Sequence, residues 1–171
     1  FFFKQKTAYE IYQCDWSSDV CSSDLCVRKY TFEPYIVHPA EVVEILKTVP
    51  HTDAMLAAAW LHDVVEDTAV KLDTITAEFG PEISYLVYEL TKKSKPEDGP
   101  RWKRKQIDRD WLTYVSPEAK TIKLADLISN TKSIVERDPE FAKIYLAEKR
   151  ELLEILTQGD AVLYEQAAQI F

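Results

Sequence analysis

Four prolines, each at the start of a segment with helical composition, constrain the fold more than any other feature of this sequence. Pro39, Pro81, Pro117 and Pro139 all precede runs of helix-forming residues. Proline is well tolerated in the first turn of a helix, where its missing N–H has no intrahelical partner in any case. The pattern therefore predicts helices that begin at these four positions.

Caps and stop signals define the remaining helices. Thr52 can cap a helix that starts at Asp53, and Asp160 can cap a last helix. The stretch SKPEDGPRW, residues 94–102, has the proline, aspartate and glycine of a loop. The expected helices span residues 38–49, 53–68, 72–79, 81–93, 117–137, 139–156 and the segment after 160.

No segment shows the bounded alternation of polar and apolar residues that is typical of a strand. The chain has only three glycines in 171 residues, and its length suits one domain with a single core. We therefore predict an all-α fold with one helical domain spanning residues 26–171.

Residues 1–25, FFFKQKTAYEIYQCDWSSDVCSSDL, differ in character from the rest. Back-translated, they resemble a widely used sequencing adapter read in frame, and we interpret them as an artefactual, non-native segment. We expect the native N-terminal helix of the domain to be missing for this reason. Two of the three cysteines lie in the segment, and Cys26 alone supports no disulfide, which fits a reducing cytoplasm.

Charge and hydropathy exclude two classes of partner. The formal net charge of -8 argues against general binding of DNA or RNA, which usually needs a basic surface. No apolar run of about 18 residues occurs, so no membrane span is expected. The sequence does not indicate an oligomeric state.

The stretch AAAWLHDVVEDT, residues 57–68, places one histidine and three acids on an otherwise apolar helical run. In a continuous helix His62 would lie above Glu66 and Asp63 above Asp67, since residues four apart are neighbours on a helix surface. No lysine offsets these acids between residues 53 and 68. Acids so crowded repel one another unless a cation lies among them.

Two ligands rarely hold a metal, and His38 and Asp126 are the candidates to complete the set. Each has a plainer interpretation when taken alone: His38 as a residue at a helix start, and Asp126 as a partly buried acid paired with Lys123. Beside the His62–Asp63 doublet, a shared metal explains all four residues better. His51, next to a proline, is interpreted as a loop residue.

The motifs PYIVHP, LHDVVEDT and KLADLISN, in this order and spacing, resemble those of the HD-domain metal-dependent phosphohydrolases. More closely, they are similar to the hydrolase domain of the RelA/SpoT alarmone enzymes and to the small alarmone hydrolases. The resemblance extends from Val27 to Phe171 and implies an HD-domain helical bundle.

The resemblance also implies a reaction and a ligand set. His38, His62, Asp63 and Asp126 would bind one divalent metal, manganese in this family, although these ligand types also suit zinc or iron. Glu66 and Asp67 would act on the attacking water as the catalytic pair. The reaction implied is removal of the 3′-diphosphate of guanosine tetra- or pentaphosphate, giving GDP or GTP and pyrophosphate.

Substrate contacts are implied at four positions: Arg28 and Lys29 at the base, and Asn130 and Tyr145 along the nucleotide pocket. Phe32 stands where the family usually has glycine, so the pocket edge is expected to differ. The basic stretch TKKSKPEDGPRWKRKQIDR, residues 91–109, fits either phosphate binding or a solvated helix face.

Two alternatives to the guanosine substrate stay open. The same pocket suits another 3′-phosphorylated nucleotide, such as NADPH or an adenosine alarmone. A catalytically silent nucleotide-binding regulator is the alternative from a different class. Such a regulator would have lost a metal ligand or one of the two catalytic acids, and all six residues are present.

Overall fold

The computed structural model describes residues 36–170, and the predictions for Arg28, Lys29, Phe32 and the segment 1–25 lie outside these residues. Helices account for every regular element between residues 36 and 170, so the all-α prediction is confirmed. In chain order the elements are α2 (Val37–Leu46), α3 (Asp53–Leu61), α4 (Val64–Asp67), α5 (Leu72–Phe79), α6 (Pro81–Leu90), the 3-10 turn η1 (Pro96–Asp98), α7 (Arg101–Thr113), α8 (Pro117–Arg137), α9 (Pro139–Leu153) and α10 (Ala161–Ala168).

The predicted caps form as expected. The Thr52 hydroxyl accepts a hydrogen bond from the amide of Met55, and the Asp160 carboxylate accepts two at the start of α10. Pro81, Pro117 and Pro139 are the first residues of their helices. Pro39 instead lies in the third position of α2. Proline is tolerated there, because the amides of the first turn have no intrahelical partner.

Several predictions about helix boundaries were wrong. The helices expected to end at residues 49, 93 and 156 end at residues 46, 90 and 153. Two differences are larger. The helix expected over residues 53–68 is interrupted at His62 and Asp63, which separate α3 from α4. The loop expected through Trp102 ends earlier, because α7 begins at Arg101, directly after Pro100. Tertiary contacts account for α7: the indole of Trp111 packs on the core and donates a hydrogen bond to the carbonyl of Glu89.

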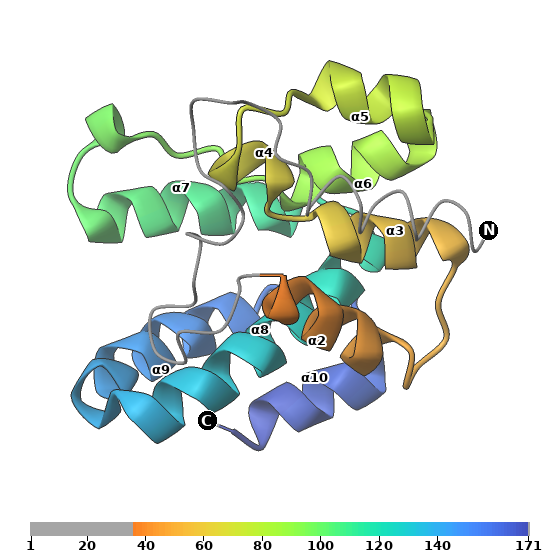
Figure 1. Ribbon diagram of the computed structural model, residues 1–171. Coiled ribbons are helices and arrows are strands. Elements are labelled where there is room, and N and C mark those ends of the chain that lie inside the picture. The colour runs from red at the N-terminus through yellow and green to blue at the C-terminus, as the bar shows by residue number, and fades with distance from the viewer. Residues whose placement is uncertain (1–35, 171) are drawn as a thin grey trace.

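The long helix α8 is the centre of the fold, with α2, α3, α6, α9 and α10 packed against it (Figure 1). Its apolar side chains Ile122, Leu124 and Leu127 are almost fully buried in the main core. A polar stripe on α8, at positions 123, 126, 129 and 130, follows the three- and four-residue spacing of one helix face. This stripe is where the candidate site forms. None of the helices within residues 36–170 is long and apolar enough to cross a membrane.

Candidate metal centre and adjoining cavity

The interruption between α3 and α4 allows the side chains of the neighbouring residues His62 and Asp63 to point toward the same place. In a regular helix their side chains would diverge by about 100°. Here Nδ1 of His62 lies 2.8 Å from the carbonyl of Ala59, which a continuous helix would offer to the amide of Asp63. Asp63 has φ −100° and ψ −6°, and its Oδ2 lies 3.2 Å from Nε2 of His62. The predicted ridges of a continuous helix are therefore absent from this segment.

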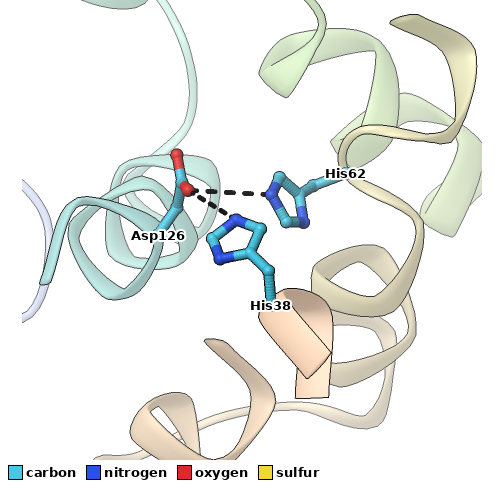
Figure 2. Close-up of side chains that lie close together, drawn as sticks. All are labelled: His38, His62 and Asp126. Carbon is cyan, nitrogen blue, oxygen red and sulfur yellow. Dashed lines mark ion pairs between the residues drawn. The ribbon is translucent and has the colours of Figure 1, made fainter. Parts of the chain in front are cut away.

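Three segments bring the four predicted metal ligands together. His38 comes from the first turn of α2, His62 from the α3–α4 junction and Asp126 from α8 (Figure 2). Asp63 follows His62 at the same junction. Asp126 Oδ1 lies 3.1 Å from Nε2 of His38 and 3.8 Å from Nε2 of His62. Asp63 Oδ2 lies 3.9 Å from Nε2 of His38. Two imidazole nitrogens and two carboxylates thus face one another.

The donor set fits a divalent ion. His38, His62 and Asp126 are buried, and one ligand atom of each lies within 4.8 Å of the others. The Nε2 atom of His62 makes no hydrogen bond of normal geometry within residues 36–170. Its Nδ1 is bound to a backbone carbonyl, which leaves the lone pair on Nε2. A ligating histidine usually has this second contact, which fixes its tautomer and ring orientation.

Asp126 is the most strongly held acid of the group. Lys123 donates to its Oδ2 at 2.7 Å, and Asn130 donates to its Oδ1 at 2.6 Å. Burial raises the pKa of Asp126, but the positive charge of Lys123, together with the hydrogen bond and charges of His38 and His62, outweighs burial and holds the pKa well below its usual range. The plainer interpretation of Asp126, an acid paired with Lys123, is correct as a contact. It is compatible with metal binding, because Oδ1 still faces both histidines.

The charges around His62 favour a cation at this point. Burial lowers the pKa of His62, but the negative charges of Asp63 and Asp126 raise it more, to about 9. A proton or a metal ion can supply the positive charge that these carboxylates stabilise. A proton on Nε2 of His62 and a metal ion would therefore compete for the same position.

The two predicted catalytic acids have different surroundings. The Glu66 carboxylate accepts hydrogen bonds from both the backbone amide and the side chain of Lys92. Asp67 is exposed, and burial of part of its side chain, followed by the charge of Asp63, raises its pKa. Both acids lie in α4, directly after Asp63.

A cavity of about 370 Å³ lies between α7, α8 and α9. Lys123 connects it to the metal-ligand cluster, since this lysine lines the cavity and donates to Asp126. Burial, followed by the charge of Lys123, lowers the pKa of Lys149 to about 7. Five cationic side chains line the cavity: Lys92, Lys105, Arg109, Lys123 and Lys149.

Each acid of the cavity wall already has a hydrogen-bond or ion-pair partner. Glu148 forms a bidentate pair with Arg101, and Glu151 pairs with Arg109. Asp108 accepts hydrogen bonds from the amides of residues 93 and 94. Among residues 36–170, neither Lys105 nor Lys149 has a carboxylate at ion-pair distance. The cavity therefore has an excess of positive charge.

Comparison with known proteins identifies the fold and its relatives. A family model described as HD domain matches residues 14–155, most of the chain. The chain belongs to the HD-domain family. The guanosine-3′,5′-bis(diphosphate) 3′-pyrophosphohydrolase of Homo sapiens is 38% identical to this HD domain over 109 residues, which are 63% of this chain and 59% of the human protein. A GTP pyrophosphokinase of Brucella ovis is 37% identical over 111 residues, 63% of this chain and 15% of its own length.

A solved structure supports the same placement of this HD domain. It is a metazoan ortholog of SpoT, described as hydrolysing ppGpp with a role in starvation responses. It superimposes with a TM-score of 0.84 at 26% identity, covering 98% of this chain and 93% of the other. The resemblance predicted from the sequence motifs is thus confirmed. The aligned parts span between 15% and 59% of the curated relatives' own lengths.

The remaining predicted residues of the HD domain fall in different places. Asn130 contacts Asp126 rather than the cavity. Tyr145 is 7% exposed, lies in a small apolar cluster with Ile134 and Ala142, and is not part of the cavity lining. Burial, followed by the charge of Asp126, raises the pKa of Tyr145.

The basic stretch 91–109 divides between its two interpretations. Lys92, Lys105 and Arg109 line the cavity, whereas Lys103 is exposed to solvent. Lys93 lies over the rings of Tyr88 and Trp111. His51 is an exposed loop residue, as predicted.

Sequence reasoning missed Glu41, Ser129 and Lys149. Ser129 accompanies Asp126 at a spacing of three, and Glu41 accompanies His38 at the same spacing. Residues three apart share a helix face, so this spacing was the available signal. Lys149 lies 23 positions after Asp126 in the sequence. The packing of α9 on α8 brings it near the candidate metal centre. No local pattern could have identified it.

Proposed function

We propose that this HD domain is a metal-dependent hydrolase that removes the 3′-diphosphate of guanosine tetra- or pentaphosphate, releasing pyrophosphate and GDP or GTP. The observation that carries the proposal is the convergence of two buried histidines and Asp126 from three separate segments. Relatives named as 3′-pyrophosphohydrolases of guanosine-3′,5′-bis(diphosphate) supply the substrate class. Manganese is the proposed ion, although the same ligands suit zinc or iron.

The residues of the site divide the work. His38, His62, Asp63 and Asp126 would hold the ion, which when bound acidifies a water and polarises a phosphoryl oxygen. Asp67 is the better proton acceptor of the catalytic pair, since its pKa is raised while Glu66 already accepts two hydrogen bonds from Lys92. Water attacks the phosphorus next to the 3′-oxygen, the bond between them breaks, and the proton passes to that oxygen.

The cavity supports a polyanionic substrate. Burial is the first cause of the lowered pKa values of Lys105 and Lys149, and repulsion from neighbouring lysines lowers both pKa values further. A bound phosphate would relieve the repulsion. We therefore propose that phosphates of the nucleotide away from the reacting one enter this cavity. Arg28, Lys29, Asn130 and Tyr145 remain proposed contacts of the nucleotide. The cytoplasm remains the proposed location of the protein.

The decisive experiment incubates the full chain with ppGpp and Mn²⁺ and measures pyrophosphate release. NADPH and an adenosine alarmone serve as competing substrates in parallel reactions. Release from ppGpp at the highest kcat/KM supports the proposal, and preference for another nucleotide favours the alternative substrate. A protein that binds ppGpp without hydrolysing it would instead be the silent regulator.

Metal content tests the ligand set separately. The wild type should bind one manganese ion per chain, and D63A should bind it much more weakly. Elemental analysis after gel filtration measures both. Equal manganese in the two proteins would show that the proposed ligand set is wrong.

A further inference from the structure

The second nitrogens of the two site histidines are held by different kinds of partner. Nδ1 of His62 faces a backbone carbonyl, which can only accept a hydrogen bond. Nδ1 of His38 lies 3.1 Å from the hydroxyl of Ser129, which can either donate or accept. The tautomer of His38 therefore depends on what else that hydroxyl contacts.

Glu41 decides the direction of the hydrogen bond. The Ser129 hydroxyl lies 2.8 Å from Oε2 of Glu41 and donates to it, because a carboxylate has no proton to give. A serine hydroxyl has a single proton, so Ser129 can only accept from Nδ1 of His38. The proton of a neutral His38 then lies on Nδ1, and the lone pair lies on Nε2, which faces Asp126 at 3.1 Å.

We infer that Glu41 and Ser129 form a positioning pair that holds His38 in its metal-binding tautomer. This inference rests on the proposed function, because it assumes that the cluster binds a metal. The pair spans two helices, α2 and α8, and Ser129 is 4% exposed while Glu41 is exposed to solvent. A charged group at the surface thus sets the state of a buried ligand through one hydroxyl.

The buried hydroxyl of Ser129 and the charge of Glu41 can be removed separately by substitution. Outer partners of ligating histidines typically contribute about 10- to 100-fold to metal affinity. We expect S129A to bind Mn²⁺ at least about tenfold more weakly, and S129T, which keeps the hydroxyl, to recover most of the affinity. Titration of the full chain with Mn²⁺, followed by the signal of free Mn²⁺ in electron paramagnetic resonance, measures the affinity.

The exposed acid has a matched control on its own helix. E41Q should weaken Mn²⁺ binding less than S129A does, because the amide oxygen can still accept but without charge. E44Q should leave the affinity unchanged, because Glu44 lies three residues further along α2 and pairs with Lys47 at 2.7 Å. If S129A does not fold, the comparison of E41Q with E44Q still decides the matter.

A spectroscopic measurement separates positioning from general stability. Long-range ¹H–¹⁵N spectra of the metal-free protein should show Nδ1 of His38 protonated in wild type and S129T, and a smaller Nδ1-protonated fraction in S129A, which has no hydroxyl to accept from Nδ1. Unchanged Mn²⁺ affinity in both S129A and E41Q, with the wild type binding one ion, would overturn the positioning pair alone. A wild type that binds no Mn²⁺ would overturn the proposed metal site as well.

Discussion

The metal-ligand cluster and the cationic cavity share one residue, Lys123, but are built in opposite ways. The cluster gathers lone pairs of buried histidines and carboxylates at the meeting point of α2, α8 and the α3–α4 junction. The cavity gathers lysines from α7, α8 and α9, and its acids are occupied by Arg101 and Arg109. One region is suited to a cation and the other to an anion. A substrate with phosphates near a metal needs both, side by side.

The largest expected effect comes from removing the Asp126 carboxylate from the cluster. D126N should lower Mn²⁺-dependent hydrolysis of ppGpp by more than about 100-fold, which exceeds the usual effect of changing an outer partner. The wild type should gain about 2.7 kcal/mol of stability at a Mn²⁺ concentration 100 times Kd, and the variant should gain none. Initial rates and thermal unfolding with and without Mn²⁺ measure both effects.

A cavity acid provides the control for this change. Asp108 lines the cavity but is held by backbone amides rather than by the histidines. D108N should therefore keep the stabilisation by Mn²⁺. If D126N is stabilised by Mn²⁺ as much as the wild type, the cluster is not the metal site.

A smaller effect is expected from removing one cation of the cavity. K149M should raise KM for ppGpp about tenfold, which corresponds to about 1.4 kcal/mol, and leave Mn²⁺ affinity unchanged. K143M is the matched control, since Lys143 lies on the same helix, is exposed and pairs with Glu140. Steady-state kinetics of the three proteins test this. A drop in kcat at constant KM would place Lys149 in the chemical step instead.

The smallest expected effect is a difference in pH dependence between the two regions of the metal-free protein. The pKa of His62 is raised from 6.5 to about 9, so its stabilising contribution is complete below pH 6.5 and lost as pH rises toward 9. The pKa of Lys149 is lowered from 10.5 to about 7. Between pH 7 and pH 10.5, Lys149 is protonated in the unfolded chain and neutral in the folded chain. The contribution of Lys149 to the free energy of unfolding therefore rises with pH in this range.

K149M removes the contribution of Lys149, which rises with pH, and leaves that of His62, which falls with pH. Its free energy of unfolding should therefore decline more steeply than that of the wild type from pH 7.5 to 8.5, by up to about 1.4 kcal/mol per pH unit. Urea unfolding in the presence of a chelator gives the two slopes. Parallel slopes would mean that Lys149 is protonated in the folded protein throughout this range.

Local signals predicted most of the helix starts, and the residues that they singled out for a metal lie together in the structure. The prolines at positions 81, 117 and 139 mark true helix starts, and Thr52 and Asp160 form the expected caps. His38, the His62–Asp63 doublet and Asp126 each stand out within a few residues of sequence, as a polar group in an apolar run. Helix α7 was missed because its stability comes from Trp111 and from ion pairs to α9, which are not local.

The sequence alone determined where most helices begin and which side chains have the chemistry for a metal, because capping, helix propensity and ligand type depend on near neighbours. Only the tertiary structure decided how those groups meet. The break at His62 turns Asp63 back toward its neighbour, and the packing of α2 on α8 brings Glu41 to Ser129. These arrangements depend on contacts between residues far apart in the chain, such as the 88 positions between Glu41 and Ser129. Spacing within a helix can show which residues share a face, but it does not specify which two helices meet.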